Sequence, residues 1–272
     1  MGVEQRYLEL MKQSLTHLLY GGDDEYAPVK RPRNLLKRLL FDSLQRRGIA
    51  MCRRNLTDVN LRMEGKWPLP EIALTAIGLT GLNNLQFCVE DVLRRNVPGD
   101  LIETGAWRGG ASIFMRAVLA AHGVTDRKVY VADSFQGLPK PNAEKYPADA
   151  GDPHHTYDFL AVSLEEVKRN FSRYGLLDEQ VCFLKGWFRD TLPELRDQRW
   201  SVIRLDGDMY ESTHDGLVNL YPNLSLGGYI IVDDYGAVKG CREAVDDFRR
   251  DNRLTEPIRQ VDWGRVFWQR ED

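Results

Sequence analysis

Short apolar segments alternate with helical stretches in the chain beyond Gly99, and this alternation constrains the fold more than any other sequence feature. The apolar segments have the length and composition of strands, and they lie at residues 100–103, 129–133, 181–185, 200–206 and 228–232. Helices are predicted between and after them, near residues 110–121, 163–174, 215–221 and 241–252. Strands that alternate with helices are typical of a parallel sheet with crossover helices. We therefore predict an α/β fold.

The first third of the chain has a different, largely helical pattern. Apolar residues recur at helical spacing over residues 7–19 and again over residues 70–95, where one or two helices are expected. At the other end of the chain, residues 258–269 look like edge strands around a Trp-Gly turn. A chain of 272 residues fits one elaborated domain. We expect a helical N-terminal extension, residues 1–96, that packs on a core of residues 97–272 as one integrated domain.

One part of this extension is unusually basic. Residues 30–54 contain nine lysines and arginines around several leucines, and a single aspartate. A basic helical stretch can be a partner helix, a membrane-surface helix or a mobile cover over an anionic ligand. A solvated helix face is equally compatible with the pattern.

The overall composition excludes several classes of partner. The chain has 37 basic and 40 acidic residues, so its net charge of −3 provides no global attraction to nucleic acid or to an anionic membrane. Its four cysteines are scattered, which favours reduced thiols over a disulfide framework or a zinc site. Because there is neither a secretory signal pattern nor an apolar run long enough to span a bilayer, we expect a cytoplasmic protein without membrane insertion.

A glycine-rich turn follows the first predicted strand of the core. The run from Glu103 through Thr104 and Gly105 to Gly109 ends a strand and opens a helix, which allows a ligand to approach the backbone closely. The G-x-G-x-x-G fingerprint of dinucleotide-binding proteins is not matched. The E-x-G-x-x-x-G form resembles motif I of class I methyltransferases. This resemblance implies that Gly105 lies beside the methionine part of S-adenosylmethionine and that Glu103 engages its amino end. A purely structural tight turn is the alternative.

The next two strand ends provide candidates for the rest of this cofactor. Asp133 ends the second strand, where an acid can accept both hydroxyls of a ribose, and Ser134 follows it. Gly186 and Trp187 close the third strand and are suited to hold an adenine by backbone contact and stacking. The alternatives are that Asp133 caps the turn after it and that Trp187 is a core residue.

Acidic residues gather after the last two parallel strands. Asp206 ends one strand with Asp208 just beyond, and Asp233 and Asp234 end the neighbouring strand. Carboxylates at adjacent strand ends repel one another, and a hard divalent cation such as Mg²⁺ relieves that repulsion. We predict that Asp206, Asp233 and Asp234 are metal ligands, with Asp206 also beside the cofactor. Capping of the next helices, or pairing with arginines such as Arg204, is the alternative.

A proline-rich loop at residues 136–158 interrupts the rhythm of strands and helices. Loops of this length are usually functional or disordered, and this one follows a strand at the ligand-binding edge of the sheet. Methyl transfer to a hydroxyl needs a base, and a histidine suits neutral pH. His155 is the first candidate and Asp208 the second; a surface histidine without a role is nearly as compatible, and His154 is equally ambiguous.

Taken together, these motifs resemble the macrocin O-methyltransferase family. The resemblance extends over nearly the whole chain and is carried by E-T-G-A-W-R-G-G, A-D-S-F-Q-G, N-F-S-R-Y-G-L-L-D, G-W-F-R-D-T-L-P, R-L-D-G-D-M-Y and V-D-D-Y. It implies a class I methyltransferase fold with a Rossmann-like sheet, and an enzyme that uses S-adenosylmethionine and Mg²⁺ to methylate a sugar hydroxyl of a glycosylated natural product, such as a macrolide or an aminocoumarin. It also implies metal ligation by Asp206, Asp233 and Asp234, ribose binding by Asp133, a base role for His155, and a homodimer or higher homo-oligomer.

Two other functions compete with this interpretation. A phenol or catechol O-methyltransferase would use the same fold, cofactor and metal, whereas a non-methyl enzyme or a binding module on the same fold would bind S-adenosylmethionine poorly. We further hypothesise that residues 30–54 form a lid whose apolar face contacts the aglycone of the acceptor.

Overall fold

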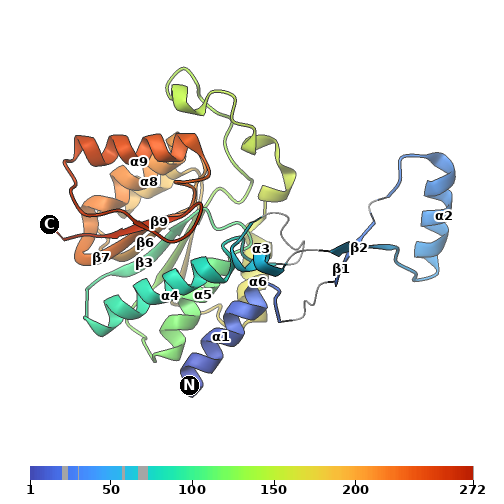
Figure 1. Ribbon diagram of the computed structural model, residues 1–272, viewed down its shortest axis with the longest axis horizontal. Helices are drawn as coiled ribbons and strands as arrows, with labels where there is room; N and C mark the ends of the chain where they lie inside the picture. The colour runs from blue at the N-terminus through green and yellow to red at the C-terminus, as the bar shows by residue number, and fades with distance from the viewer. Residues whose placement is uncertain (20–23, 30, 57–58, 67–72, 272) are drawn as a thin grey trace.

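The protein consists of a layered body and a smaller part that stands apart from it (Figure 1). The computed structural model describes residues 1–19, 24–29, 31–56, 59–66 and 73–271. The body contains a seven-stranded sheet, and the smaller part contains a two-stranded sheet and one helix. This confirms the predicted α/β class.

The seven-stranded sheet has the order β5-β4-β3-β6-β7-β9-β8. The strands β3 to β7 run parallel, whereas β9 is antiparallel to β7 and β8 is antiparallel to β9. Their bounds are β3 (Asp100–Thr104), β4 (Val129–Asp133), β5 (Val181–Lys185), β6 (Trp200–Leu205), β7 (Leu224–Val232), β8 (Arg259–Gln260) and β9 (Val266–Gln269). The two strands predicted around the Trp-Gly turn are therefore present as β8 and β9, but only β8 is an edge strand, because β9 lies between β7 and β8. The strand order reverses between β3 and β6, and ligands bind at the carboxyl ends of strands at such a point.

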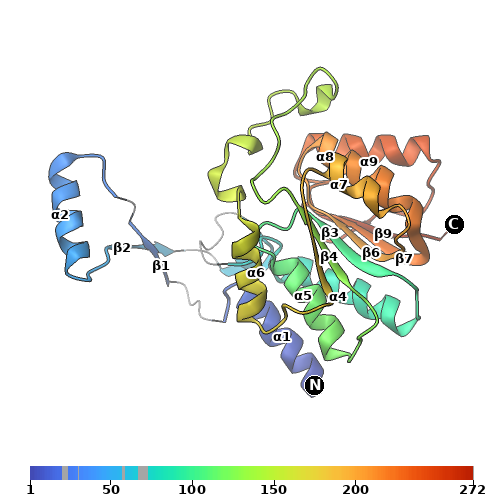
Figure 2. The same cartoon turned by 180° about the vertical axis from the view of Figure 1, so that it is seen from behind.

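Helices cover both faces of this sheet, as the two views of the molecule show (Figures 1 and 2). Alternate strand residues belong to two apolar clusters: Leu101 packs with helices on one face, and Ile102 packs with helices on the other. The first cluster takes residues from α1 (Val3–Leu15), α4 (Gly78–Arg94), α5 (Gly110–Ala121) and α6 (Leu164–Arg173). The second takes residues from α8 (Tyr210–Leu220) and α9 (Lys239–Asp251), with the short α7 (Phe188–Thr191) beside it. Burial on both faces explains the nearly continuous apolar runs of the central strands.

The helices predicted near the N-terminus are present as α1 and α4. Leu8 and Leu15 of α1 and Leu82 of α4 are fully buried in the same cluster as α5. These two helices are thus continuous with the core, and the short α3 (Val59–Met63) precedes α4. Residues 70–72 of the predicted stretch lie outside the described residues. None of the described helices is long and apolar enough to cross a bilayer.

The smaller part is a projecting arm, by which we mean residues 24–56 apart from residue 30. Its strands β1 (Asp24–Pro28) and β2 (Cys52–Leu56) pair antiparallel in a sheet of their own, and α2 (Leu35–Arg46) connects them at the far end (Figure 1). A helix in the basic stretch was expected, but the two strands were not, because their sequences do not alternate between apolar and polar residues. Four leucines of α2 are 55 to 78% exposed, namely Leu35, Leu36, Leu39 and Leu40.

Candidate active site

A cavity of about 640 Å³ opens at the carboxyl ends of the parallel strands. Its volume lies within the range of about 300–1,000 Å³ that is usual for small-molecule sites. Its walls come from the ends of β3 to β7, from the loop after β4, and from the turn between β8 and β9. The predicted functional residues that line it are Glu103, Gly105, Asp133, Ser134, Gly186, Trp187, Asp206, Asp208, Asp233 and Asp234.

Gly105 brings the ends of β3 and β6 together. Its φ is +87°, and a Cβ atom at this position would lie 1.7 Å from the carbonyl oxygen of Asp206, so a side chain cannot be accommodated. Just before it, Glu103 is buried and accepts hydrogen bonds from Ser112 and from Nη1 of Arg204 (2.5 Å). Burial raises the pKa of Glu103. Thr104 is buried but does not line the cavity.

Asp133 stands at the end of β4 and is strongly engaged by the backbone. One carboxylate oxygen accepts from the N–H groups of Ala106 (2.7 Å) and Trp107 (3.3 Å), and the other accepts from the N–H of Phe135 (2.7 Å). Burial raises the pKa of this carboxyl. Asp133 therefore does cap the turn that follows it, as the alternative interpretation expected. Each carboxylate oxygen has two lone pairs, so these three N–H donors leave one acceptor position for a ribose hydroxyl, on the oxygen that accepts from Phe135.

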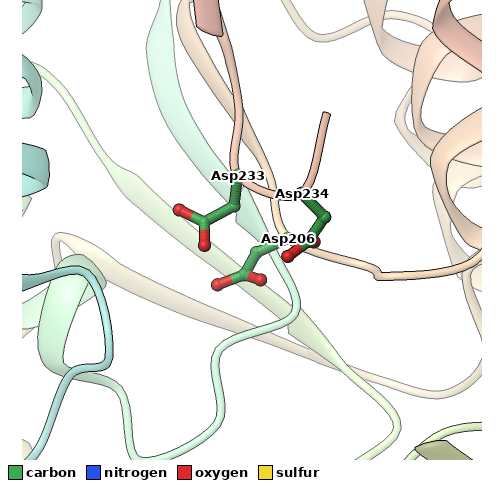
Figure 3. A group of neighbouring side chains, drawn as sticks. All are labelled: Asp206, Asp233 and Asp234. Atoms are coloured by element: carbon green, nitrogen blue, oxygen red, sulfur yellow. The ribbon is translucent and has the colours of Figure 1, made fainter. Parts of the chain in front are cut away.

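The carboxylates of Asp206, Asp233 and Asp234 converge at the ends of β6 and β7 (Figure 3). One oxygen from each lies within 4.8 Å of the others. Burial, together with the charge of the neighbouring aspartates, raises the pKa values of Asp206 and Asp234 well above the usual range. An uncompensated cluster of this kind is costly in the protein interior.

Two buried arginines offset part of this negative charge. One oxygen of Asp233 accepts from Nη2 of Arg204 and from Nε of Arg265 (2.8 Å), and these two cations lower the pKa of Asp233 against the effect of its burial. Arg204 also donates to Asp206 (2.8 Å), so the predicted alternative of pairing with Arg204 is present. Arg265 comes from the turn before β9, where it donates to Asp262 (2.5 Å).

The residues present fit a divalent cation. Glu103 and the three converging aspartates provide four carboxylates, whereas Arg204 and Arg265 provide two cations. The arginines occupy one oxygen of Asp233, which leaves the second oxygen for a ligand. A set of donors composed of carboxylate oxygens suits Mg²⁺ or a similar hard ion.

Asp208 lies directly beside this cluster in an unusual backbone conformation. Its φ is +58°, and its N–H donates to Asp234 (3.1 Å). Burial is the main cause that raises the pKa of Asp208 to about 6, while His154 opposes the shift. A non-glycine residue with positive φ is strained, and such residues often occur at functional sites.

The structure brings His154, and not His155, to Asp208. Nε2 of His154 is 3.8 Å from a carboxylate oxygen of Asp208, and Nδ1 of His154 lies 2.9 Å from Asp152. His154 lines the cavity, whereas His155 is exposed and does not line it. The sequence could not distinguish the two histidines, because adjacent residues in a loop share the same local signals.

A family model, described as macrocin-O-methyltransferase (TylF), matches residues 4–270. The chain belongs to the macrocin O-methyltransferase family. It is therefore an S-adenosylmethionine-dependent O-methyltransferase, with the class I fold that the sequence predicted.

Two relatives and one solved structure illustrate the similarity of this methyltransferase to characterised members. It is 49% identical over 264 residues to 8-demethyl-8-(2,3-dimethoxy-alpha-L-rhamnosyl)-tetracenomycin-C 4'-O-methyltransferase of Streptomyces olivaceus, covering 96% of this chain and 91% of the relative. It is 52% identical over 212 residues to demethyldecarbamoylnovobiocin O-methyltransferase of Streptomyces niveus, covering 77% and 80%. The structure of the O-methyltransferase NovP superposes with a TM-score of 0.85 at 44% identity, covering 99% of this chain and all of the other.

Three features of the methyltransferase site were not predicted from the sequence. Arg265 reaches Asp233 from an edge turn, where an arginine would ordinarily be exposed. Asp152 holds His154 through a contact inside the loop. Trp263 lines the cavity from the Trp-Gly turn, which the sequence predicted only as a connection between two strands. The sequence signal for the last two was an acidic or aromatic residue next to glycine or proline, since Asp152 lies between Gly151 and Pro153 and Trp263 precedes Gly264.

Proposed function

We propose that this methyltransferase methylates a sugar hydroxyl of a glycosylated natural product, with a divalent cation held by Asp206, Asp233 and Asp234. The observation that carries the proposal is the convergence of these three carboxylates in the same cavity as Gly105 and Asp133. The sugar acceptor is supported by the names of the relatives, which specify a rhamnosyl group with 4'-O-methyl transfer and a mycinamicin 3''-O-methyl transfer. We take the acceptor to be a macrolide, an aminocoumarin or a similar glycoside.

When bound, S-adenosylmethionine supplies an electrophilic methyl group, and a divalent cation such as Mg²⁺ lowers the pKa of a hydroxyl and fixes its position. The protein residues supply alignment. In this proposal, Glu103 and Gly105 hold the methionine end, Asp133 and Ser134 hold the ribose, and the ends of β5 and β6 complete the pocket with Gly186, Trp187 and Asp206. Such alignment converts a bimolecular encounter into an effectively unimolecular step.

In our proposal, Asp208 accepts the proton of the acceptor hydroxyl. Its raised pKa of about 6 leaves it mostly ionised at neutral pH while keeping it basic enough to act. His154 stands beside it with Nε2 3.8 Å away, and Asp152 fixes the orientation of that ring through Nδ1. His155 is no longer our first candidate for the base, because it lies outside the cavity lining.

We also propose that the arm acts on a second copy of the chain, which makes the enzyme a homodimer or a higher homo-oligomer. Residues 30–54 carry nine basic residues and one acidic residue, whereas the whole chain has a net charge of −3, so the remainder is strongly acidic. The four leucines of α2 are exposed. No described residue of the arm lines the cavity of its own chain, so a lid made by this segment would close over the cavity of a partner.

The expected cytoplasmic location remains part of this proposal. All four cysteines are free thiols, and Cys88 and Cys241 are buried. Reduced thiols of this kind are usual in the cytosol.

Calorimetry and acceptor screening test the proposed reaction. We expect S-adenosylmethionine to bind the wild type, Asp133→Ala to weaken that binding, and Asp234→Ala, at a proposed metal ligand without a cofactor contact, to retain it while losing the Mg²⁺ dependence of turnover. Mass spectrometry of the products should show one added methyl group on a deoxysugar glycoside and none on the free aglycone. Methylation of catechols or phenols in preference to glycosides would favour the competing O-methyltransferase function. Absence of cofactor binding by the wild type would contradict the assignment of the cavity.

A further inference from the structure

The start of α8 is capped by a residue from a distant segment. Met209, the N-cap residue, makes no capping hydrogen bond with its side chain. Instead, the carboxylate of Asp149 accepts from the N–H groups of Tyr210 (2.6 Å) and Glu211 (3.0 Å). Asp149 is only 2% exposed. A carboxylate at a helix N-terminus satisfies donors that would otherwise be unpaired and interacts favourably with the helix dipole.

The two segments that this cap joins, the start of α8 and the loop that contains Asp149, both continue to residues at the proposed base. On the α8 side, Asp208 lies two residues before Tyr210, and its strained backbone is held by the hydrogen bond to Asp234 (3.1 Å). On the loop side, the carbonyl of Asp149 accepts from the N–H of Asp152 (3.1 Å), and Asp152 in turn holds His154. The cap therefore joins the two segments whose side chains meet 3.8 Å apart as His154 and Asp208.

The neighbouring helix leaves room for this cap. Gly240, in the first turn of α9, faces it: a Cβ atom there would lie 2.7 Å from a carboxylate oxygen of Asp149 and 3.0 Å from the nitrogen of Tyr210. Any larger residue at position 240 would displace the carboxylate or the helix start. The cap thus depends on three separate segments of the chain.

We propose that Asp149 is a positioning residue for methyl transfer, which ties the loop of residues 136–158 to the start of α8 and so holds His154 against Asp208. The proposal rests on the proposed function, since it concerns the same site. Asp149 is absent from the cavity lining, so it acts through the segments it joins and has no contact with the substrate.

The first test measures the attachment of the loop without any turnover. Lys145 is exposed in the loop four residues before Asp149, and trypsin can cleave after it, whereas Lys140 is followed by a proline. With the full chain saturated with S-adenosylhomocysteine and Mg²⁺, we expect Asp149→Ala to be cleaved after Lys145 about tenfold faster than the wild type. The matched control is Ser163→Ala, which removes the side-chain cap of α6 (3.2 Å to the N–H of Glu166) and should change this rate less than twofold. An unchanged cleavage rate in Asp149→Ala would overturn the proposal.

The second test asks whether Asp149 acts through His154. We expect Asp149→Ala to lower kcat roughly 10- to 100-fold while the acceptor KM changes much less and the Kd for S-adenosylmethionine stays within twofold. His154→Ala alone should lower kcat by a similar factor. In the Asp149→Ala variant, the same substitution should lower kcat less than threefold, because the contact between His154 and Asp208 is already lost. Fully multiplicative losses would show that the two residues act independently and would refute the positioning role.

Two further variants keep the test decisive if Asp149→Ala does not fold. Asp149→Asn keeps the size and one acceptor oxygen, and we expect a smaller loss of kcat with the same dependence on His154. Gly240→Ala disturbs the same cap from α9 and should accelerate cleavage after Lys145 in the same way. If neither variant changes the cleavage rate or kcat, the proposal is wrong. Failure of the proposed function is distinguishable, because a wild type that methylates no glycoside would still give the proteolysis result.

Discussion

The cavity and the projecting arm differ in whether their charged and apolar side chains are in contact with the rest of the same chain. In the cavity, the partners come from the same chain: Asp233 lies between Arg204 and Arg265, and Asp133 accepts from the turn after β3. In the arm, Phe41 is buried, but the four leucines of α2 are exposed to solvent. Exposed apolar groups gathered on one element are usually an interaction surface.

In our proposal, this difference separates chemistry that one chain completes from recognition that requires a second molecule. The carboxyl ends of neighbouring parallel strands lie at the same edge of the sheet. The acids that follow β6 and β7 are therefore close together, whichever other contacts their side chains make. No equivalent rule fixes the position of a helix at the end of a two-stranded sheet.

Asp208→Asn should produce the largest loss. The variant keeps the shape of the side chain but cannot accept the acceptor proton, so kcat should fall by roughly 10²- to 10⁴-fold, the usual worth of a positioned base. Steady-state kinetics with a saturating glycoside would measure it. Asp197→Asn, at an exposed position outside the cavity, should leave kcat unchanged. An Asp208→Asn enzyme with wild-type kcat would mean that His154 or another group is the base.

Arg265→Met should weaken metal binding. The variant removes one of the two cations that orient Asp233, and we expect the affinity for Mn²⁺, a spectroscopic substitute for Mg²⁺, to fall roughly 10- to 100-fold. Electron paramagnetic resonance of free Mn²⁺ measures this without turnover. Arg250→Met removes an exposed arginine of α9 and should have no effect. If Arg265→Met bound the cation more tightly, Arg265 would instead be a competitor for the carboxylate.

The fold could be predicted from the sequence because its signals are local and repeated. Each parallel strand is an apolar run of a few residues, and Leu101 and Ile102 feed opposite faces as the twofold period of a strand requires. The start of α8 was placed at residue 215, five residues late, because its cap is Asp149, which is distant in the sequence. A cap of this kind leaves no pattern next to the helix it begins.

The site was predictable to the extent that its residues sit at strand ends. Asp206, Asp233 and Asp234 were found in this way, and they converge. The arrangement of His154 and Asp208 was not, because it depends on the path of a long loop that hydrogen bonds hold in place. Topological rules position strand ends, whereas loop side chains are positioned by particular contacts.

The pH dependence of metal binding should reflect the raised pKa values of the carboxylates. Burial and neighbouring aspartates raise the pKa values of Asp206 and Asp234, so at a pH below these values a cation must displace protons to bind. Metal affinity should therefore rise with pH, by about tenfold per pH unit for each proton displaced. Calorimetry in buffers of different ionisation enthalpy would count those protons. A pH-independent affinity would indicate other ligands.

The same raised pKa values predict the direction in which the stability of the fold changes with pH. A carboxyl whose pKa is higher in the folded than in the unfolded state stabilises the fold at low pH and loses that contribution as the pH rises through its folded value. For Asp208 this value is about 6. In EDTA, the melting temperature should thus fall between pH 5 and pH 7.5 by roughly 2–4 °C for each ~1 kcal/mol lost, and Mg²⁺ should restore it. Melting that rises over this interval in EDTA would contradict these shifts.

Replacing the arm by a short glycine-serine linker should have the smallest effect on the catalytic machinery. No described residue of the arm lines the cavity of its own chain, so the Kd for S-adenosylmethionine should stay within twofold and the melting temperature should change little. The acceptor KM should rise several-fold and the mass measured by light scattering should fall, because the arm would no longer reach a second copy. Leu36→Ser with Leu40→Ser, which keeps the arm but removes half of its exposed leucines, should shift both quantities in the same direction. Loss of cofactor binding without a change in mass would mean that the arm completes the cavity of its own chain, and the contrast between the two regions would not hold.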